Sequence, residues 1–262
     1  MASALETYHN YTLLHDDLMD NALLRRGQPT VHKKWNANTA ILSGDSMLVF
    51  AYKLLAECNV DKLKEVLDLF TITALEIGEG QQYDMDFELR NDVAESEYIE
   101  MIRLKTSVLL ACSMKIGAIL AGAPSEDANN LYRFGELIGL AFQLQDDYLD
   151  VYGDSKVFGK AIGGDIASNK KTFMLINALA KANETQRKEL EMWIANTNVE
   201  DEQKKIEAVT ALYNAIGIDV LAQEKINFYF EESKKYLAAV PLSDEIKKEL
   251  TDYVARMMKR NY

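Results

Sequence analysis

Residues 142–154 read FQLQDDYLDVYGD and end the clearest helical pattern in the chain, which runs over about 126–152. Residues 13–20 read LLHDDLMD and end a second helical pattern with the same DDxxD spacing. In both patterns, apolar residues recur at intervals of three and four, the period of one face of an α-helix. These two stretches predict long helices that each finish in an acidic cluster.

Helical periodicity extends over most of the remaining sequence. It predicts further helices over about 37–57, 61–89, 95–121, 171–182, 184–196, 200–238 and 243–260. Residues 25–29 contain a glycine and a proline and are predicted to form a loop, as is the glycine-rich segment 153–170. Because no segment alternates convincingly as a strand would, we predict an all-α fold with a single domain over residues 1–262.

The composition restricts the classes of function. The 262 residues carry 29 basic and 41 acidic side chains, a formal charge of −12. Such a charge disfavours nonspecific binding to nucleic acids and anionic membranes, and no apolar run approaches the ~18 residues of a membrane span. Cys58 and Cys112 lack the spacing of a zinc or redox site, so we expect a reduced, cytoplasmic setting. An anionic substrate would need locally clustered cations or a bound metal.

The acidic clusters predict a divalent cation. The outer aspartates of each cluster, Asp16 with Asp20 and Asp146 with Asp150, are four residues apart and share one helical face. Their repulsion and the negative end of the helix dipole cost tenths of a kcal/mol to about 1 kcal/mol per contact. A solvated acidic surface is the plainer alternative, but the identical spacing of two clusters favours a metal. Mg²⁺ fits better than Ca²⁺, since it binds through one or two carboxylates plus water and substrate phosphates.

Basic residues follow both clusters closely. Arg25 and Arg26 come shortly after the first cluster, and Lys160, Lys170 and Lys171 lie in or just beyond the glycine-rich segment after the second. Each of them alone would be interpreted as a surface charge. Beside metal-binding carboxylates, however, guanidinium and ammonium groups are suited to bind phosphate oxygens. The pattern indicates a diphosphate held between a metal ion and these cations.

In these motifs the chain resembles the trans-isoprenyl diphosphate synthase family, which includes farnesyl and geranylgeranyl diphosphate synthases. The resemblance rests on LLHDDLMD ending at Asp20, LLRRGQPTVH ending at His32, GQQYDM from Gly80, KTSVLL from Lys105, FQLQDDYLDVYGD from Phe142 and GKAIGGDIASNKKT from Gly159. It implies an isoprenoid-synthase-type helical domain around a central cavity, usually a homodimer. It also implies head-to-tail condensation of isopentenyl diphosphate with an allylic diphosphate.

The resemblance implies roles for individual residues by their position in these motifs. The Mg²⁺ ligands would be Asp16, Asp20 and Asp146, supported by Asp17, Asp147 and Asp150. The allylic diphosphate would be clamped by Arg25, Lys105, Lys160 and Lys170, and isopentenyl diphosphate would be bound by His9 and Arg26. The polar groups near the developing cation would be Thr106, Gln143 and Gln81. The chemistry explains these residue types. Ionising the allylic C–O bond adds charge to the leaving diphosphate, which cations stabilise. A backbone carbonyl at a helix kink near Lys105 and Thr106, with the Gln143 amide, would stabilise the allylic cation through dipoles.

Two tyrosines upstream of the first cluster predict the product length. In the family the product chain grows along the first helix, away from the aspartates. Tyr11 lies five residues before Asp16, about 7.5 Å along a helix, and Tyr8 lies eight residues before it on a similar face. We expect a bulky ring there to act as a floor and to limit products to farnesyl or geranylgeranyl diphosphate. Thr12 is small and leaves the choice between fifteen and twenty carbons open.

Other interpretations of the sequence remain open. A class I terpene cyclase uses the same ionisation but normally carries an Asn/Asp–Ser/Thr–Glu motif in place of the second cluster. A noncatalytic subunit of a heteromeric prenyl synthase tends to lose one cluster, whereas both are present. His9 could be a plain hydrogen-bonding residue, and Gln81 with Asp84 a helix-surface pair.

One departure from the family pattern concerns the start of the chain. No upstream Gly-Lys-x-x-Arg-Pro segment, which binds isopentenyl diphosphate in relatives, occurs in the sequence. The domain therefore lacks the family's N-terminal helices as the sequence stands. We expect either that such a segment exists in the native protein or that the second substrate site is incomplete. In the latter case the chain would bind Mg²⁺ and an allylic diphosphate but condense poorly.

Overall fold

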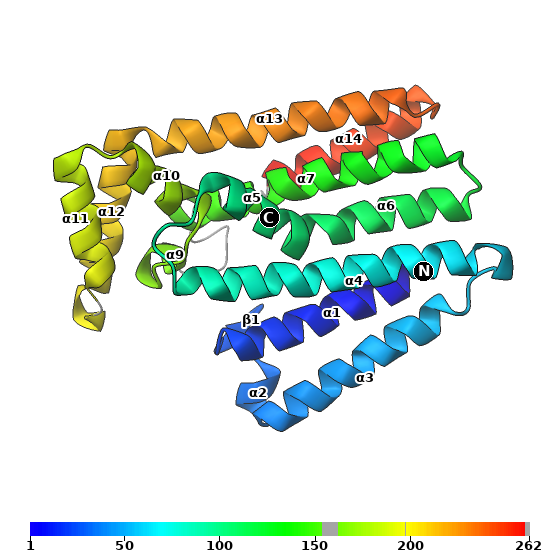
Figure 1. Ribbon diagram of the computed structural model, residues 1–262, viewed down its shortest axis with the longest axis horizontal. Helices are drawn as coiled ribbons and strands as arrows, with labels where there is room; N and C mark the ends of the chain where they lie inside the picture. Colours follow the sequence, from blue (N-terminus) through cyan, green and yellow to red (C-terminus); the bar gives the residue numbers. More distant parts are fainter. Residues whose placement is uncertain (154–161, 197, 260–262) are drawn as a thin grey trace. The chain divides into compact units, whose positions relative to one another are not determined.

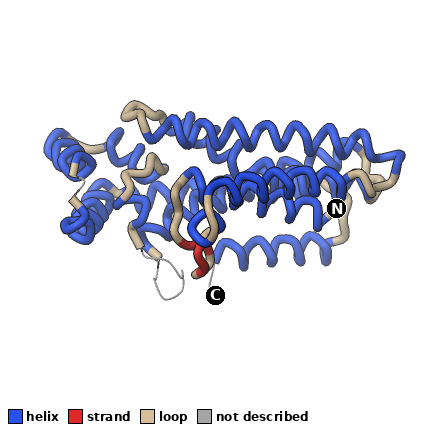
Figure 2. Tube along the Cα trace, turned by 90° about the horizontal axis from the view of Figure 1, so that it is seen from below, coloured by secondary structure: helices blue, strands red, loops and turns tan. Residues whose placement is uncertain are grey.

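The computed structural model describes residues 1–153, 162–196 and 198–259. Nearly all of them are helical, with one short hairpin of strands (Figure 2), so the predicted all-α fold class is confirmed. The residues fall into two compact units. Unit 1 comprises Met1–Ile72 and Ile116–Ala123, and unit 2 comprises the described part of Thr73–Lys115 and Pro124–Tyr262. The single domain over residues 1–262 stays a prediction.

Unit 1 is built on two helices that lie side by side, α1 and α3 (Figure 1). Its elements are α1 (Ala2–Met19), β1 (Leu24–Arg25), β2 (Gln28–Pro29), α2 (Val31–Lys34), α3 (Ala37–Leu55), the first part of α4 (Val60–Glu88) and the end of α6 (Val108–Leu120). The α1 and α3 helices approach closely because Gly44 has no side chain: a Cβ there would lie 2.1 Å from the His15 ring. The His15 Nε2 atom lies 3.2 Å from the Ile41 carbonyl oxygen, so His15 serves packing in this unit.

Unit 2 contains the second acidic cluster and most of the apolar core. Its elements are the rest of α4, α5 (Glu95–Ile102), the π-helical turn η1 (Arg103–Ser107), the start of α6, α7 (Ser125–Tyr152), α9 (Gly164–Ala167), α10 (Phe173–Lys181), α11 (Glu184–Ala195), the 3₁₀ turn η2 (Val199–Asp201), α12 (Glu202–Ile216), α13 (Ile218–Ala239) and α14 (Asp244–Lys259). The α13 helix runs along α7 (Figure 1). Phe134 and Leu144 of α7 and Phe173 of α10 are fully buried, which anchors the helix that carries the cluster.

Four details differ from the sequence predictions. Residues 25–29 are not a plain loop, because Arg26 and Gly27 adopt φ values of 52° and 74° and so close a tight hairpin between β1 and β2. The predicted helix 200–238 is wrong: Gly217, with a φ of 83°, ends α12 and separates it from α13. The predicted helix 95–121 is interrupted by the turn η1, close to the expected kink. The predicted loop 153–170 contains the short helix α9, and residues 154–161 of it lie outside the described residues.

No membrane-spanning helix occurs in residues 1–153, 162–196 and 198–259. Within these ranges, none of the helices combines the length and the apolar composition needed to cross a bilayer.

Candidate active site

The first acidic cluster lies at the end of α1, where the β1–β2 hairpin brings an arginine back to it. The Arg25 Nε atom donates to Asp17 Oδ1 at 2.7 Å, and Arg25 Nη2 lies 3.5 Å from Asp16 Oδ2. The Asp17 side chain is 7% exposed and the Asp16 side chain 19%. Asp20 is exposed. Asp17 therefore binds Arg25, while the carboxylates of Asp16 and Asp20 are the more accessible ones.

The two residues expected to bind isopentenyl diphosphate lie near each other in unit 1. Burial lowers the pKa of His9 below its ordinary value, and the guanidinium groups of Arg26 and Arg25 lower it further, against the opposing effect of Glu6. The His9 side chain is 41% exposed, with its Nδ1 atom 4.0 Å from Glu6 Oε2. The His9 ring can donate or accept a hydrogen bond, and the positive charges of Arg26 and Arg25 act on it, so this part of unit 1 is suited to an anionic ligand.

The second acidic cluster, at the end of α7, has one buried and two partly exposed carboxylates. Asp147 is buried and accepts hydrogen bonds from the Tyr98 hydroxyl and from Gln143 Nε2, the latter at 3.1 Å. Burial, together with the Asp165 carboxylate, raises the pKa of Asp147 to about 7. The Asp150 carboxylate accepts the backbone N–H of Asp165 at 3.0 Å. Asp147 and Asp150 thus stabilise the site, while Asp146 is partly exposed at the cluster.

The turn η1 carries two of the expected catalytic residues and is held between glycines. A Cβ at Gly80 of α4 would lie 2.4 Å from the Lys105 backbone nitrogen, and a Cβ at Gly139 of α7 would lie 2.5 Å from Ser107 Cα. Any larger residue at either position would displace the backbone of the turn. Because π-helical turns leave the regular hydrogen-bond ladder, they commonly mark functional positions. The two glycines therefore let α4 and α7 pack directly against the backbone of the turn that carries Lys105 and Thr106.

Two of the lysines expected to clamp the diphosphate share one carboxylate. The Lys105 Nζ atom donates to Asp84 Oδ2 at 2.7 Å. Burial alone would raise the pKa of Asp84, but Lys170 and Lys105 outweigh it and hold that pKa below its usual value. The structure therefore pairs Asp84 with Lys105, instead of with Gln81 as a helix-surface pair, and the positive charge of Lys170 acts on the same carboxylate. Lys160 lies outside the described residues.

The polar groups expected near the allylic cation are also adjacent. The Thr106 hydroxyl donates to Gln143 Oε1 at 3.1 Å, which joins the turn η1 to α7. Gln81 follows Gly80, the residue of α4 that packs against Lys105. The Gln81 Nε2 atom is buried without a hydrogen-bond partner in the described part of the chain. An unsatisfied buried amide costs about 1–3 kcal/mol, so this atom is a candidate to contact substrate.

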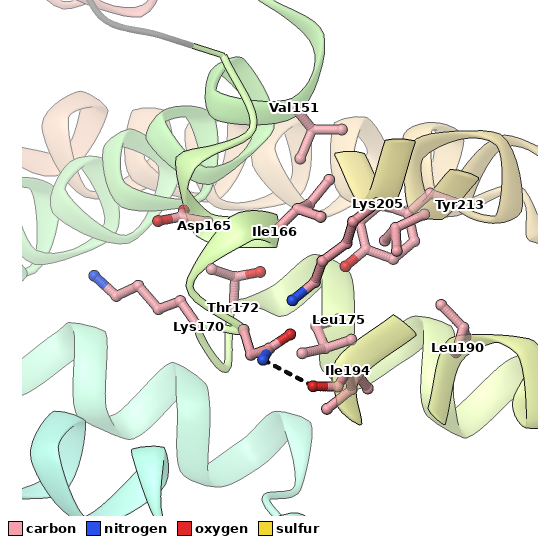
Figure 3. A pocket seen from close by; sticks show the side chains of 12 residues that line it. Val151, Asp165, Ile166, Lys170, Thr172, Leu175, Leu190, Ile194, Lys205 and Tyr213 are labelled. Atoms are coloured by element: carbon pink, nitrogen blue, oxygen red, sulfur yellow. Dashed lines mark hydrogen bonds between the residues drawn. The ribbon is translucent and has the colours of Figure 1, made fainter. Parts of the chain in front are cut away.

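A pocket near the end of α7 is lined in part by the segment that carries Lys170 (Figure 3). In Figure 3, Lys170 and Asp165 point to one side, away from the apolar residues Leu190 and Ile194. The Asn169 Nδ2 atom donates to the Ile194 carbonyl oxygen at 3.0 Å. The buried Lys205 adds donations to two further backbone carbonyls at the ends of α9 and α11, at 3.2 and 3.4 Å. These bonds fix the turn that carries Lys170, whose positive charge helps to lower the pKa of Asp84.

The two tyrosines of the expected product floor differ in their surroundings. Tyr8 is 2% exposed, and its ring contacts Phe70 edge-on, with ring centroids 5.0 Å apart. Tyr11 is half-buried, between Tyr8 at 5.4 Å and His15 at 4.8 Å. Tyr8 is thus part of the packing of unit 1, and Tyr11 is the accessible ring of the pair. Their effect on product length stays a prediction.

Each acidic cluster has oxygen donors that fit Mg²⁺ better than a metal that needs a complete protein cage. In unit 1, Asp16 is partly exposed and Asp20 is exposed, and in unit 2 Asp146 is partly exposed. In the part of the chain that the structure describes, no three His, Cys, Asp or Glu side chains are grouped to hold an ion. Mg²⁺ commonly binds through one or two carboxylates plus water and substrate phosphates, so these carboxylates suit an ion that arrives with a diphosphate.

Several residues of the site were not predicted from the sequence. Tyr98 and Asp84 contact residues 49 and 21 positions further along the chain. Lys205 interacts with carbonyls 38 and 9 positions away. A tyrosine on an amphipathic helix has no local signal that separates a core residue from a site residue. For Asp84, its position three residues after Gln81 in GQQYDM was a usable signal.

Comparison with known proteins defines the class. The family model described as polyprenyl synthetase matches residues 1–212, and the chain belongs to this family. A geranylgeranyl diphosphate synthase of Methanosarcina mazei is 46% identical over 182 residues, which are 69% of this chain and 56% of that protein. A short chain isoprenyl diphosphate synthase of Methanocaldococcus jannaschii is 43% identical over 216 residues, 82% of this chain and 65% of that protein. The chain thus spans less than two thirds of either relative.

A solved structure is similar over nearly the whole chain. The crystal structure of a geranylgeranyl pyrophosphate synthase has a TM-score of 0.94 and 43% identity, and the match covers 99% of this chain and 80% of that one. This likeness confirms the isoprenyl synthase fold that the motifs implied.

Proposed function

We propose that this chain is a trans-prenyltransferase that condenses isopentenyl diphosphate with dimethylallyl, geranyl or farnesyl diphosphate into short-chain products of fifteen to twenty carbons. The observation that carries the proposal is the ion pair of Lys105 with Asp84, beside the hydrogen bond of Thr106 with Gln143. Lys105 and Thr106 are neighbours on the turn η1, and the positive charge of Lys170 acts on the same Asp84 carboxylate. Positively charged side chains stabilise a departing diphosphate, and neutral dipoles stabilise a carbocation. Both kinds of group together suit a reaction that separates a diphosphate from a carbocation. The names of the similar proteins support this activity.

The first stage is binding and ionisation of the allylic diphosphate. We assign Mg²⁺ to Asp16, Asp20 and Asp146; when bound, it would neutralise the diphosphate and favour its departure. Lys105 has three N–H donors, so it can keep Asp84 and still donate to a phosphate oxygen. Lys170 and Arg25 complete the clamp within the described residues. Because the leaving group carries more charge than the bound ester, these cations stabilise the separated state more than the ground state.

The second stage is capture of the allylic cation by isopentenyl diphosphate. The oxygens of Thr106 and Gln143 present the negative ends of their dipoles without being good nucleophiles, so they stabilise the cation and do not trap it. Water must be excluded, since it would convert the cation to an alcohol. We assign the isopentenyl diphosphate to His9 and Arg26. The departed diphosphate then accepts the proton that the product loses.

We further propose a homodimer in the cytoplasm. Leu42 and Val49 of α3 are seven residues apart on one helical face and are 66% and 70% exposed. Phe50 and Ile41 are also exposed on this helix. Contiguous exposed apolar side chains of this kind mark interaction surfaces. The free thiols of Cys58 and Cys112 support a reducing compartment.

A product assay tests the proposed function. The chain would be incubated with labelled isopentenyl diphosphate, each allylic diphosphate in turn and Mg²⁺, and the products sized after dephosphorylation. We expect products of fifteen to twenty carbons that disappear with EDTA. Lys105→Met should abolish them, and Lys115→Met should not, because Lys115 pairs with Asn129 away from the turn η1.

The same assay separates the alternative functions. Release of hydrocarbon from farnesyl diphosphate alone would favour a terpene cyclase. No product from the purified chain, restored by a second protein, would favour a noncatalytic subunit. Allylic diphosphate binding without condensation would indicate an incomplete second substrate site.

A further inference from the structure

Three hydrogen bonds connect α5, α7 and the turn η1 in unit 2. The Tyr98 hydroxyl donates to Asp147 Oδ2, Gln143 Nε2 donates to Asp147 Oδ1 at 3.1 Å, and the Thr106 hydroxyl donates to Gln143 Oε1 at 3.1 Å. The proposed function uses Thr106 and Gln143 but gives no role to Tyr98. Both Tyr98 and Asp147 are buried, at 2% and 4% exposure, so this connection is shielded from water.

The chemistry of these groups fixes the orientation of the Gln143 amide. The Gln143 side chain presents its NH₂ group to Asp147, whose Oδ1 atom accepts the hydrogen bond. Its carbonyl oxygen then faces Thr106, whose hydroxyl is the matching donor. Amide oxygen and nitrogen are otherwise easily exchanged, and only the surrounding donors and acceptors decide between the two orientations. Asp147 is therefore the group that sets the direction of the amide dipole.

Tyr98 supplies the second donor that Asp147 needs. Burial, with the Asp147 carboxylate next to it, raises the pKa of Tyr98 well above its ordinary value, so its hydroxyl keeps its proton. Each Asp147 oxygen thus receives one donor from a different helix. Without the Tyr98 hydroxyl, one buried carboxylate oxygen would lose its partner, and the carboxylate could rotate. Rotation would free the Gln143 amide to turn its positive NH₂ end toward Thr106.

We propose that Tyr98 is a positioning residue, which acts through Asp147 to keep the carbonyl oxygen of Gln143 directed toward the site of the allylic cation. The proposal rests on the proposed function, since it assumes that a cation forms beside Thr106 and Gln143. A turned amide would place its positive end where the cation develops. This would slow ionisation more than it would weaken diphosphate binding, because the change acts on the amide of Gln143. Of the four residues in this chain of hydrogen bonds, only Asp147 is also expected to support the metal site.

The kinetic test is Tyr98→Phe, which removes only the hydroxyl. We expect kcat to fall about 10- to 100-fold while the KM values for both diphosphates stay within about twofold. Tyr132→Phe is the matched control: it removes a half-buried hydroxyl from α7 and keeps the ring near Lys115. We expect this variant to retain wild-type kcat. Equal kcat values for the two variants, or a loss in Tyr98→Phe that appears only in KM, would overturn the proposal.

A double-mutant cycle separates positioning from a general structural effect. In the Gln143→Leu background there is no amide to orient, so Tyr98→Phe should lower kcat by no more than about twofold further. Fully additive losses would show that Tyr98 acts independently of Gln143 and would refute the inference.

An NMR measurement tests the orientation even without activity. The side-chain amide signal of Gln143, assigned by its loss in Gln143→Leu, should exchange its protons slowly in the wild type and quickly in Tyr98→Phe. Gln82 is the internal reference, because its Nε2 atom makes the same bond to an aspartate four residues on, at 2.8 Å, but is exposed. Gln143 exchange as fast as that of Gln82 in the wild type would overturn the proposal, even if Tyr98→Phe does not fold. If the wild type formed no product but its Gln143 amide protons exchanged slowly, the proposed function would be refuted and the orientation of the amide would stand.

Discussion

The close packing of α4 against the turn η1 can be tested by adding a single methyl group. Gly80 is buried, and a Cβ on it would lie 2.4 Å from the Lys105 backbone nitrogen and 2.8 Å from Leu104 C and Lys105 Cα. These are backbone atoms, which cannot swing away as the end of a flexible side chain can. Relief of the contact to ordinary van der Waals distance requires the turn to move by about 1 Å.

The size of the effect follows from two opposing contributions. Replacing a helical glycine with alanine stabilises a helix by about 0.5–1 kcal/mol. Overpacking costs about 1–3 kcal/mol, and contact with backbone places Gly80→Ala in the upper part of that range. We therefore expect a net loss of about 1–2 kcal/mol in the free energy of unfolding. A shift of about 1 Å in Lys105 and Thr106 would also lower kcat by about 100-fold.

Gly78→Ala is the matched control on the same helix. Gly78 is exposed, and a Cβ there would have no atom within 4 Å, so this variant should gain about 0.5–1 kcal/mol and keep its kcat. Urea unfolding followed by circular dichroism measures the stability, and the labelled isopentenyl diphosphate assay measures kcat. If Gly80→Ala matched Gly78→Ala in both measurements, the proposed constraint on the turn η1 would be wrong.

Three further predictions concern other parts of the chain. Tyr11→Ala should lengthen the products when they are sized by chromatography, because it removes the accessible ring upstream of the first cluster; unchanged lengths would refute the product floor. Gly217→Ala should lower the free energy of unfolding by about 1 kcal/mol, since its φ of 83° is strained for any side chain although a Cβ would meet no atom within 4 Å; an unchanged melting temperature would contradict this. Burial raises the pKa of the Cys112 thiol to about 11, so in a thiol titration at pH 8 Cys58 should react first and Cys112 only on unfolding. Equal rates for the two thiols would show that Cys112 is accessible.

The secondary structure was predictable where local signals are strong. The α1 and α7 helices end at Met19 and Tyr152, close to the predicted ends, because apolar periodicity and the acidic clusters are properties of the sequence itself. Two of the differences arose at residues with positive φ. Gly217 does not interrupt the apolar pattern, and the glycine in residues 25–29 indicated a loop but not the tight hairpin that Arg26 and Gly27 close.

The site was predictable in its residue types and only partly in its contacts. The sequence identified Lys105, Lys170, Thr106 and Gln143 through motifs. The structure pairs Lys105 with Asp84, whose pKa Lys170 also lowers, and joins Thr106 to Gln143. The sequence did not identify Asp84 as the partner of Lys105. Such a pairing depends on the rotation of α4 about its axis relative to the turn η1, which no local pattern records.

The amino-acid sequence alone determined the helical class, the two DDxxD clusters and the chemistry that they favour, because periodicity, charge and spacing act over a few residues. Only the tertiary structure decided that Asp147 is buried while Asp146 is partly exposed, and that Tyr98, 49 residues away, donates to Asp147. The physical reason is that burial and long-range hydrogen bonds depend on which helix faces pack together. That packing is a property of the whole apolar core and not of any one segment.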